Sequence, residues 1–225
     1  MEKSNKTQSW QRSWTVIVLM LVGADLGIAY IIGAGEVLKN NDGRFLAPIA
    51  ITAVVPVVLF LVLYLLSART REMVWAVDIK LLTMMQMWRV IGFAFLPLYA
   101  FGILPGLFSW PAGLGDVAIG IVAVIMVTRI NSNKDYILSA KFMWFNVVGL
   151  LDFAVAVMTA GLAAGSMPRL ITNGITSAPM DVWPLNIFPS FFVPVFIIIH
   201  LSVMLKTAHL RKIRNQATDA LPQTV

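Results

Sequence analysis

The chain consists of long apolar runs separated by short polar segments. Six of the runs are long enough to cross the roughly 30 Å hydrocarbon core of a bilayer as α-helices. Pro56, Pro189 and Pro194 fall inside runs, which membrane helices tolerate where neighbouring groups satisfy the freed backbone. The pattern therefore predicts six transmembrane helices. They are Trp14–Ala34, Phe45–Leu66, Leu81–Leu104, Trp110–Ile130, Phe142–Ala163 and Leu185–Lys206.

The polar segments differ in their content of Lys and Arg. Thirteen of these residues lie on the side that holds both termini, whereas three, Lys39, Arg44 and Arg169, lie on the other side. Because Lys and Arg accumulate on the cytoplasmic side, both termini are expected in the cytoplasm. We predict an all-α, polytopic membrane helix bundle with N-in/C-in topology. It forms one domain over residues 1–214, followed by a disordered cytoplasmic tail over 215–225.

The composition agrees with a membrane protein and excludes other classes. Charged residues make up 12% of the chain, whereas soluble domains average about 25%, and the mean hydropathy is +0.82. The net charge of +6 is spread over short segments between runs, so no nucleic-acid partner is expected and the partner is the lipid bilayer. The chain has no cysteine, which excludes disulfides and thiol chemistry.

Ionisable side chains inside the predicted spans are the candidates for function, because burying charge in a bilayer is unfavourable. Three acids and one base are present, so the charges do not balance. If all four are ionised, the net charge within the membrane is −2, and a bound proton or cation would relieve it. The charged candidates are Asp25, Arg89, Asp116 and Asp152, and the polar support candidates are Gln86, Asn146 and His200.

Depth along the helices suggests which of these groups meet. Arg89 lies about 12 Å and Asp152 about 15 Å from the cytoplasmic edge, so we expect a structural or gating ion pair between spans three and five. Asp116 depends on where span four begins. A start near Trp110, with Pro111 in the first turn, buries Asp116, whereas a start at Asp116 makes it a helix cap at the surface.

Two short patterns involve Asp116. Ala24-Asp-Leu-Gly-Ile-Ala29 matches Gly115-Asp-Val-Ala-Ile-Gly120 by residue class, which would fit an inverted repeat with Asp25 and Asp116 as equivalent residues. Small residues are also frequent at ordinary helix contacts, so chance similarity stays open. Gly113-Leu-Gly-Asp116 matches the GxGD motif of intramembrane aspartyl proteases, but Asp25 follows Ala where presenilin-like enzymes have Tyr, and no Pro-Ala-Leu motif follows.

A longer pattern contains the same residues. Arg89-Val-Ile-Gly92, Leu104-Pro105 and Pro111-Ala-Gly-Leu-Gly-Asp116 extend over about a third of the chain. This pattern resembles a group of uncharacterised small bacterial multi-pass membrane proteins. The resemblance implies a bacterial inner-membrane protein and no particular activity. It favours interpreting the GxGD match as part of a turn and helix start.

These observations support one leading hypothesis and two alternatives. The first is a small proton- or ion-coupled transport protein, in which Asp25 and Asp116 bind a proton, a cation or part of a small-molecule substrate. The second is a structural or accessory membrane protein, and the third is a membrane enzyme such as a GxGD-like protease. No catalytic residue or cofactor is predicted. His200 and His209 lie nine residues apart and so face opposite sides of a helix, which disfavours a metal or haem site.

Overall fold

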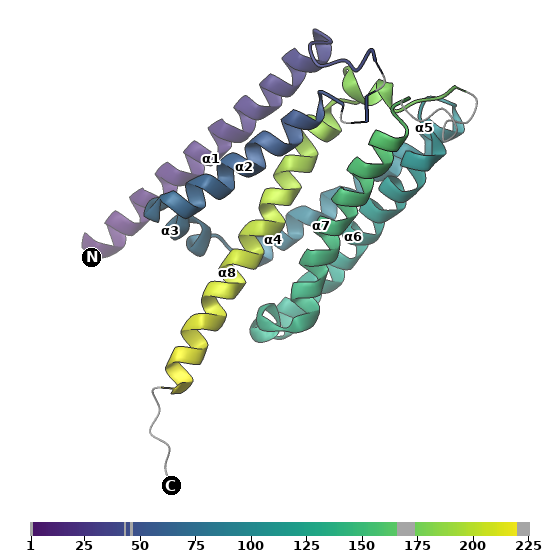
Figure 1. The fold of residues 1–225 in the computed structure, drawn as a ribbon. Coiled ribbons are helices and arrows are strands. Elements are labelled where there is room, and N and C mark those ends of the chain that lie inside the picture. Colours follow the sequence, from purple (N-terminus) through teal and green to yellow (C-terminus); the bar gives the residue numbers. More distant parts are fainter. Residues whose placement is uncertain (1, 43, 46, 166–173, 220–225) are drawn as a thin grey trace.

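The structure is a computed structural model that describes residues 2–42, 44–45, 47–165 and 174–219. Over these residues it contains helices and no strand, as the apolar pattern predicts (Figure 1). Arg169 and the last six residues lie outside the described part. The helices are α1 (Glu2–Ala34), α2 (Ala50–Leu66), α3 (Ala68–Ala76), α4 (Ile79–Met85), η1 (Gln86–Ala94), α5 (Phe95–Ala100), α6 (Gly106–Ser132), η2 (Lys134–Leu138), α7 (Ala140–Leu162), η4 (Ala178–Asp181), η5 (Phe188–Phe192) and α8 (Val193–Asp219).

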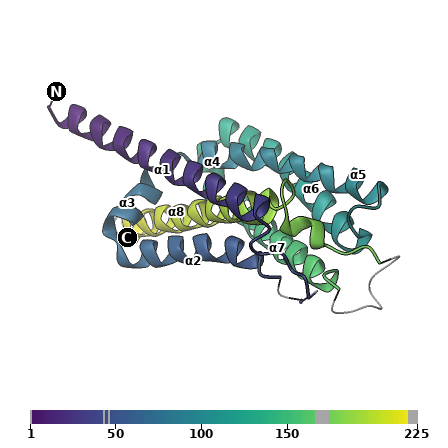
Figure 2. The same ribbon diagram turned by 90° about the horizontal axis from the view of Figure 1, so that it is seen from above.

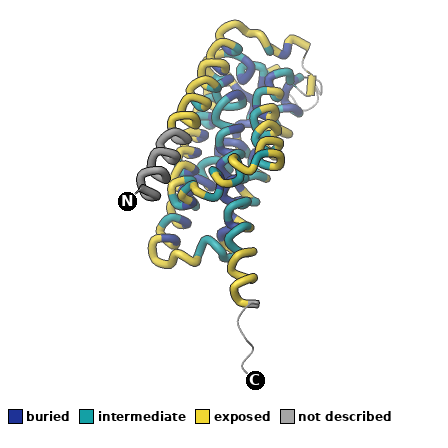
Figure 3. Tube along the Cα trace, turned by 90° about the vertical axis from the view of Figure 1, so that its left-hand side faces the viewer, coloured by how far each residue is buried: buried dark blue, intermediate teal, exposed yellow. Residues whose placement is uncertain are grey.

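The distribution of side chains is the reverse of a water-soluble protein. Large apolar side chains cover the surface, with Leu66 81% and Trp88 69% exposed, whereas Arg89 and His200 are fully buried. Figure 3 shows the buried positions along the centre of the bundle and the exposed ones along its outside. Within the described residues, five helical segments are long and apolar enough to span a membrane, with α4, η1 and α5 counted as one, or six if α2 and α3 form one bent span. The N-terminal end of α1 and the C-terminal end of α8 lie at the same end of the bundle (Figure 1).

The second predicted span is shorter than expected and is followed by a sharp bend. α2 begins at Ala50 instead of Phe45, and α3 leaves it at 106°. Ser67 causes the break, because its backbone is extended and its hydroxyl accepts from the Thr70 N–H at 3.3 Å, which caps α3. Arg71 Nη1 donates to a carbonyl near the end of α2, that of Leu65, at 2.9 Å. α3 is therefore a short helix folded back across one end of the bundle.

The third predicted span is not a uniform α-helix. α4 is capped by Asp78 and passes directly into η1, a 3₁₀-helix of nine residues, before α5 resumes α-helical winding. A 3₁₀-helix has three residues per turn, so side chains three apart are eclipsed. Gln86, Arg89 and Gly92 are accordingly the buried residues of η1, and they form one straight column toward the core.

The fourth span begins earlier than predicted. α6 starts at Gly106 after the extended Pro105, so Pro111 lies inside the helix and not in its first turn. Most of residues 105–109, which lie between the third and fourth predicted spans, are therefore helical. Asp116 is ten residues into α6, which excludes the alternative that it caps the helix.

The last span contains a local change in winding. η5 is a single π-helical segment ahead of α8, and it includes Pro189. α8 then continues without interruption to Asp219, far past the predicted end at Lys206. Residues 215–219, the first part of the segment predicted as a disordered tail, are helical in α8, and 220–225 lie outside the described part.

α1 lies at the edge of the bundle (Figure 2). Ala29 and Gly33 are the buried positions among its described side chains, and they face the segment that precedes α8. Asn186 Nδ2 donates to the Ala29 carbonyl at 2.6 Å, and a methyl group on Gly33 would overlap the Asn186 side chain. α1 therefore docks through a narrow strip of small residues near its C-terminal end.

Candidate functional site

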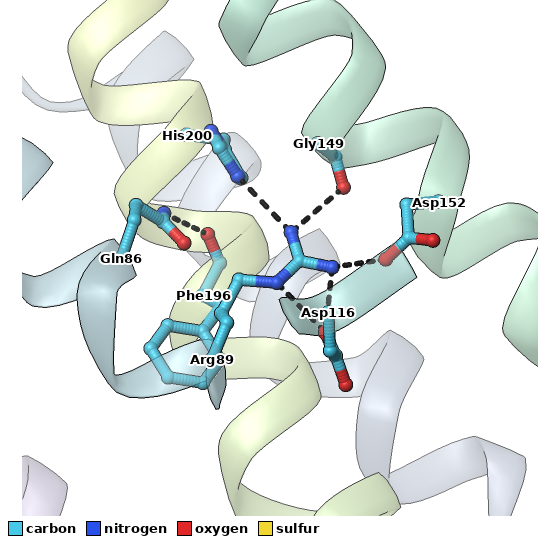
Figure 4. Close-up of polar contacts among 7 residues, drawn as sticks. All are labelled: Gln86, Arg89, Asp116, Gly149, Asp152, Phe196 and His200. Atoms are coloured by element: carbon cyan, nitrogen blue, oxygen red, sulfur yellow. Dashed lines mark hydrogen bonds and ion pairs between the residues drawn. The ribbon is translucent and has the colours of Figure 1, made fainter. Parts of the chain in front are cut away.

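Arg89 lies at the centre of the bundle and contacts α6, α7 and α8 (Figure 4). Its Nε donates to Oδ1 of Asp116 at 2.8 Å, and its Nη2 lies 2.7 Å from the same oxygen and also donates to Asp152. Nη1 donates to the Gly149 carbonyl at 3.1 Å and lies 3.4 Å from Nε2 of His200. A guanidinium has five N–H donors. Every donor of Arg89 therefore has a partner inside the protein.

Asn146 fixes the position of the proton on His200. Its Nδ2 donates to the Phe142 carbonyl at 2.8 Å, which turns Oδ1 toward Nδ1 of His200 at 3.0 Å. An amide oxygen only accepts, so Nδ1 carries the hydrogen and Nε2 presents its lone pair to Arg89. His200 is thus a neutral acceptor that orients the guanidinium.

Glycines on three elements make room for the cluster of Arg89, Asp116, Asp152 and His200, here called the Arg89 cluster. A methyl group on Gly92 would overlap Asp116, one on Gly115 would overlap Asp152, and one on Gly149 would overlap His200. The helices can approach closely only because these positions lack a side chain. The Arg-x-x-Gly and Gly-Asp pairs in the sequence therefore supply both the charged groups and the space that they occupy.

Two carboxylates share the single guanidinium of the Arg89 cluster. With both ionised and His200 neutral, the cluster carries a net charge of −1. The Arg89 side chain has no exposed surface, whereas Asp116 and Asp152 retain 16% and 13% exposure. An uncompensated buried charge is strongly unfavourable. A bound proton or an additional cation would bring the cluster to neutrality.

Arg89 and Asp116 also line a cavity of about 110 Å³ whose walls are mostly apolar. Six of the lining phenylalanines follow one another with ring centroids 4.5–6.5 Å apart, and we call them the aromatic strip. The strip ends at the Arg89 cluster, where the Arg89 Cζ lies 3.9 Å from the centroid of the last ring. In order, the rings are Phe108, Phe95, Phe188, Phe192, Phe196 and Phe153.

A second carboxylate, Asp181, lines the same cavity outside the candidate spans. Its side chain is buried, and its Oδ2 accepts from the Asn40 backbone N–H at 3.1 Å. Burial raises the pKa of Asp181 above the ordinary value for aspartate, and the hydrogen bond from Asn40 opposes that rise. Ser177, which also lines the cavity, donates its hydroxyl to the Ala160 carbonyl at 2.8 Å.

The predicted candidates divide into two groups. The expected contact between Arg89 and Asp152 is present, and Asp116 joins it, although the sequence paired Asp116 with Asp25. Asp25 shares a face of α1 with Ala29, and its described contacts include no hydrogen bond or ion pair with the cluster. No described hydrogen bond or ion pair joins Asp25 to Asp116, and Asp25 is not among the described residues that line the cavity beside Asp116.

The polar support candidates lie in or beside the cluster. His200 and Asn146 belong to its hydrogen-bond network. Gln86 lies one 3₁₀ turn before Arg89, and its Nε2 donates to the Phe196 carbonyl at 3.2 Å, so it ties η1 to α8 (Figure 4). Among the described residues, no group of three His, Asp or Glu side chains is placed to hold a metal ion.

Sequence reasoning missed several residues of the site. The Gly149 carbonyl carries no sequence signal, since every residue has one. The ring of Phe153 against Arg89 could have been proposed, because it directly follows Asp152. Asp181 lies in the polar segment between two predicted spans, where an acid is ordinarily solvated, so its position does not predict a buried carboxylate.

A comparison with protein families places residues 45–207 in a family described as a domain of unknown function, DUF8737. Comparisons with curated proteins and with solved structures gave no match. The matched range includes the Arg89 cluster, the aromatic strip and Asp181, and it leaves out α1 with Asp25. Because the match covers most of the sequence, the chain belongs to the DUF8737 family.

Proposed function

We propose that the protein is a small proton-coupled transport protein of the bacterial cytoplasmic membrane, with both termini in the cytoplasm. Asp116 and Asp152 share one proton beside Arg89, and the cavity receives the transported molecule. The observation that carries the proposal is the unequal charge of the Arg89 cluster, in which one guanidinium faces two carboxylates next to a cavity. Proton binding at intramembrane carboxylates is a common basis of coupled transport.

The first test measures the proton itself. Infrared spectroscopy of the purified protein in lipid nanodiscs at neutral pH should show the carbonyl band of a protonated carboxylic acid. Asp116→Asn and Asp152→Asn should each remove or shift that band, whereas Asp135→Asn, on an exposed turn, should leave it in place. A spectrum that none of the three substitutions changes would mean that both carboxylates are ionised, which would overturn the proposal.

The second test measures proton movement. In proteoliposomes with an entrapped pH-sensitive dye, an inside-negative potential set by potassium and valinomycin should drive proton entry. Entry should fall to the protein-free rate in Asp116→Asn and remain in Asp135→Asn. Equal rates in both variants would show that Asp116 has no part in the movement.

A structural or accessory role is the second candidate, because the internal saturation of all five Arg89 donors also suits a static helix clamp. The exchange Arg89→Asp with Asp152→Arg separates the two. A clamp should recover much of the stability lost in Arg89→Asp alone, and no proton entry should be seen in any variant. An aspartyl protease is less favoured, since Arg89 occupies both carboxylates that would have to activate water.

A further inference from the structure

The polar side chains on the cavity wall differ in whether their donors and acceptors are already used. Among the described residues that line the cavity, four carry charge or a hydroxyl: Arg89, Asp116, Ser177 and Asp181. The donors among them are already used, since the five N–H groups of Arg89 and the hydroxyl of Ser177 all have partners within the protein. An anionic ligand would therefore find no free side-chain donor among these residues.

The acceptors on the wall are only partly used. Both contacts between Arg89 and Asp116 go to Oδ1, whereas Oδ2 lies beside Gly92 and has no described hydrogen-bond donor. Asp181 is similar, because Asn40 donates to its Oδ2 and no described donor reaches Oδ1. The cavity wall thus carries two carboxylates from different elements, each with one oxygen that has no described donor, and it favours a ligand that is positively charged and donates hydrogen bonds.

The aromatic strip favours the same charge. The face of an aromatic ring attracts cations, and Arg89 already lies over the Phe153 ring at 3.9 Å. The remaining rings continue this surface along the cavity, and their edges and faces also bury apolar carbon. The volume of about 110 Å³ is on the order of a cavity that holds a single benzene ring.

We propose that the cavity binds a small organic ammonium ion with an apolar body about one aromatic ring in size. Its ammonium group donates to the Asp116 carboxylate, its body packs against the aromatic strip, and Asp181 adds a second negative charge from another part of the wall. This inference names a substrate class for the proposed function and rests on it. Binding of the ammonium ion can nevertheless be measured separately from transport, because it requires no proton gradient.

The test compares three probes of nearly equal shape on the purified full chain in lipid nanodiscs, by isothermal titration calorimetry against empty nanodiscs. 2-Phenylethylammonium should bind with one site per chain. 2-Phenylethanol, which is neutral, should bind at least about tenfold more weakly, and 3-phenylpropionate should show no saturable binding. Equal binding of the neutral and cationic probes, or preference for the anion, would overturn the proposal.

Variants locate the binding. Asp116→Asn should weaken 2-phenylethylammonium at least about tenfold, and Asp181→Asn should weaken it several-fold. Phe192→Leu, which keeps an apolar side chain but loses the ring, should also weaken it, whereas Phe60→Leu on α2, outside the cavity lining, should not. If Asp116→Asn fails to fold, the contrast between Phe192→Leu and Phe60→Leu still decides. Unchanged affinity in Phe192→Leu and Asp181→Asn would place binding elsewhere and refute the inference.

The two proposals fail in different ways. A carboxylic acid band that depends on Asp116, without binding of 2-phenylethylammonium, would refute the ligand class and leave proton coupling in place. Saturable ammonium binding without such a band would refute proton coupling and leave a cation-binding site.

Discussion

The Arg89 cluster and the Asp25 region of α1 are two acidic sites within apolar helices that look alike in sequence and differ in surroundings. Asp116 follows Gly115, which the neighbouring Asp152 side chain needs as open space, and it accepts from a buried arginine. Asp25 lies on an edge helix near Gly23 and Gly27, and neither glycine has another group within 4 Å of where a methyl would be. The same local pattern, a small residue beside an aspartate, thus serves close packing in one region and not in the other.

The contrast also bears on the predicted inverted repeat. Equivalent halves would place Asp25 and Asp116 in equivalent surroundings. α6 is instead central and packs on η1 and α7, whereas α1 touches the bundle mainly near Ala29 and Gly33. The family match, which begins after α1, divides the chain in the same way.

The largest effect should come from removing the shared cation. Arg89→Met leaves two buried carboxylates without a counter-ion, and breaking a buried pair in this way destabilises proteins by about 3–5 kcal/mol. Thermal unfolding in detergent should show a large fall in the midpoint temperature. Arg44→Met, which removes an exposed ion pair with Asp42, is the matched control and should change little. Similar midpoints for the two variants would contradict a central role for Arg89.

The second-largest effect is expected from alanine substitutions at two glycines, one near Asp116 and one near Asp25. Gly115→Ala should push Asp152 away from Arg89 and destabilise the fold by about 1–3 kcal/mol, as overpacking does. Gly27→Ala should be neutral or stabilising by up to about 1 kcal/mol, because alanine favours helix and the site is open. Denaturation of the two variants side by side measures the difference. Equal losses would mean that α1 packs as tightly as α6.

A smaller effect concerns Asp181, which binds the segment that follows α1. Its pKa is raised in the folded protein, so ionisation is less favourable there than in the unfolded chain, and stability falls as the pH rises through the folded-state pKa. Asp181→Asn retains an acceptor for the Asn40 N–H and cannot ionise. It should therefore raise the unfolding midpoint by a few degrees at neutral pH, and the gain should shrink as the pH approaches the ordinary aspartate value. If the gain in unfolding midpoint instead grew as the pH fell, the pKa of Asp181 would have to be lowered in the fold and not raised.

The smallest effect is expected at Asp25. Asp25→Asn should change the unfolding free energy by less than about 0.5 kcal/mol and leave both the carboxylic acid band and proton entry unaltered. The measurements are those proposed for Asp116. A loss of proton entry equal to that in Asp116→Asn would restore Asp25 as a partner of Asp116.

The sequence predicted the positions of residues along the helices, but it did not predict which helices are neighbours around the bundle. The lengths of the apolar runs predicted the helices, and position along those helices alone brought Arg89 and Asp152 together. Depth could not assign Asp116 to Arg89 over Asp25, because residues at similar depth can lie on opposite sides of a bundle. The helix order around the bundle is set by packing between distant segments, which no local pattern records.

The sequence also did not predict the 3₁₀ winding of η1. The residues of η1 contain no proline and no unusual propensity that would predict nine residues of 3₁₀-helix. The close approach of α6, through Gly113 and Gly120 against the backbone of η1, accompanies this winding. In the same way, the glycines of the Arg89 cluster were visible as small residues, but the side chains that fill their space come from other helices.

The 3₁₀ winding of η1 also determines the length of its span. Nine residues rise about 18 Å as a 3₁₀-helix and about 13.5 Å as an α-helix. The segment from Ile79 to Ala100 therefore reaches about 4.5 Å further than its residue count alone would give. That difference is close to the pitch of one α-helical turn, so rewinding η1 would displace Phe95, at the start of α5, relative to α4 by nearly one turn. The position of an aromatic ring on the cavity wall is thereby tied to the pitch of the segment that carries Arg89.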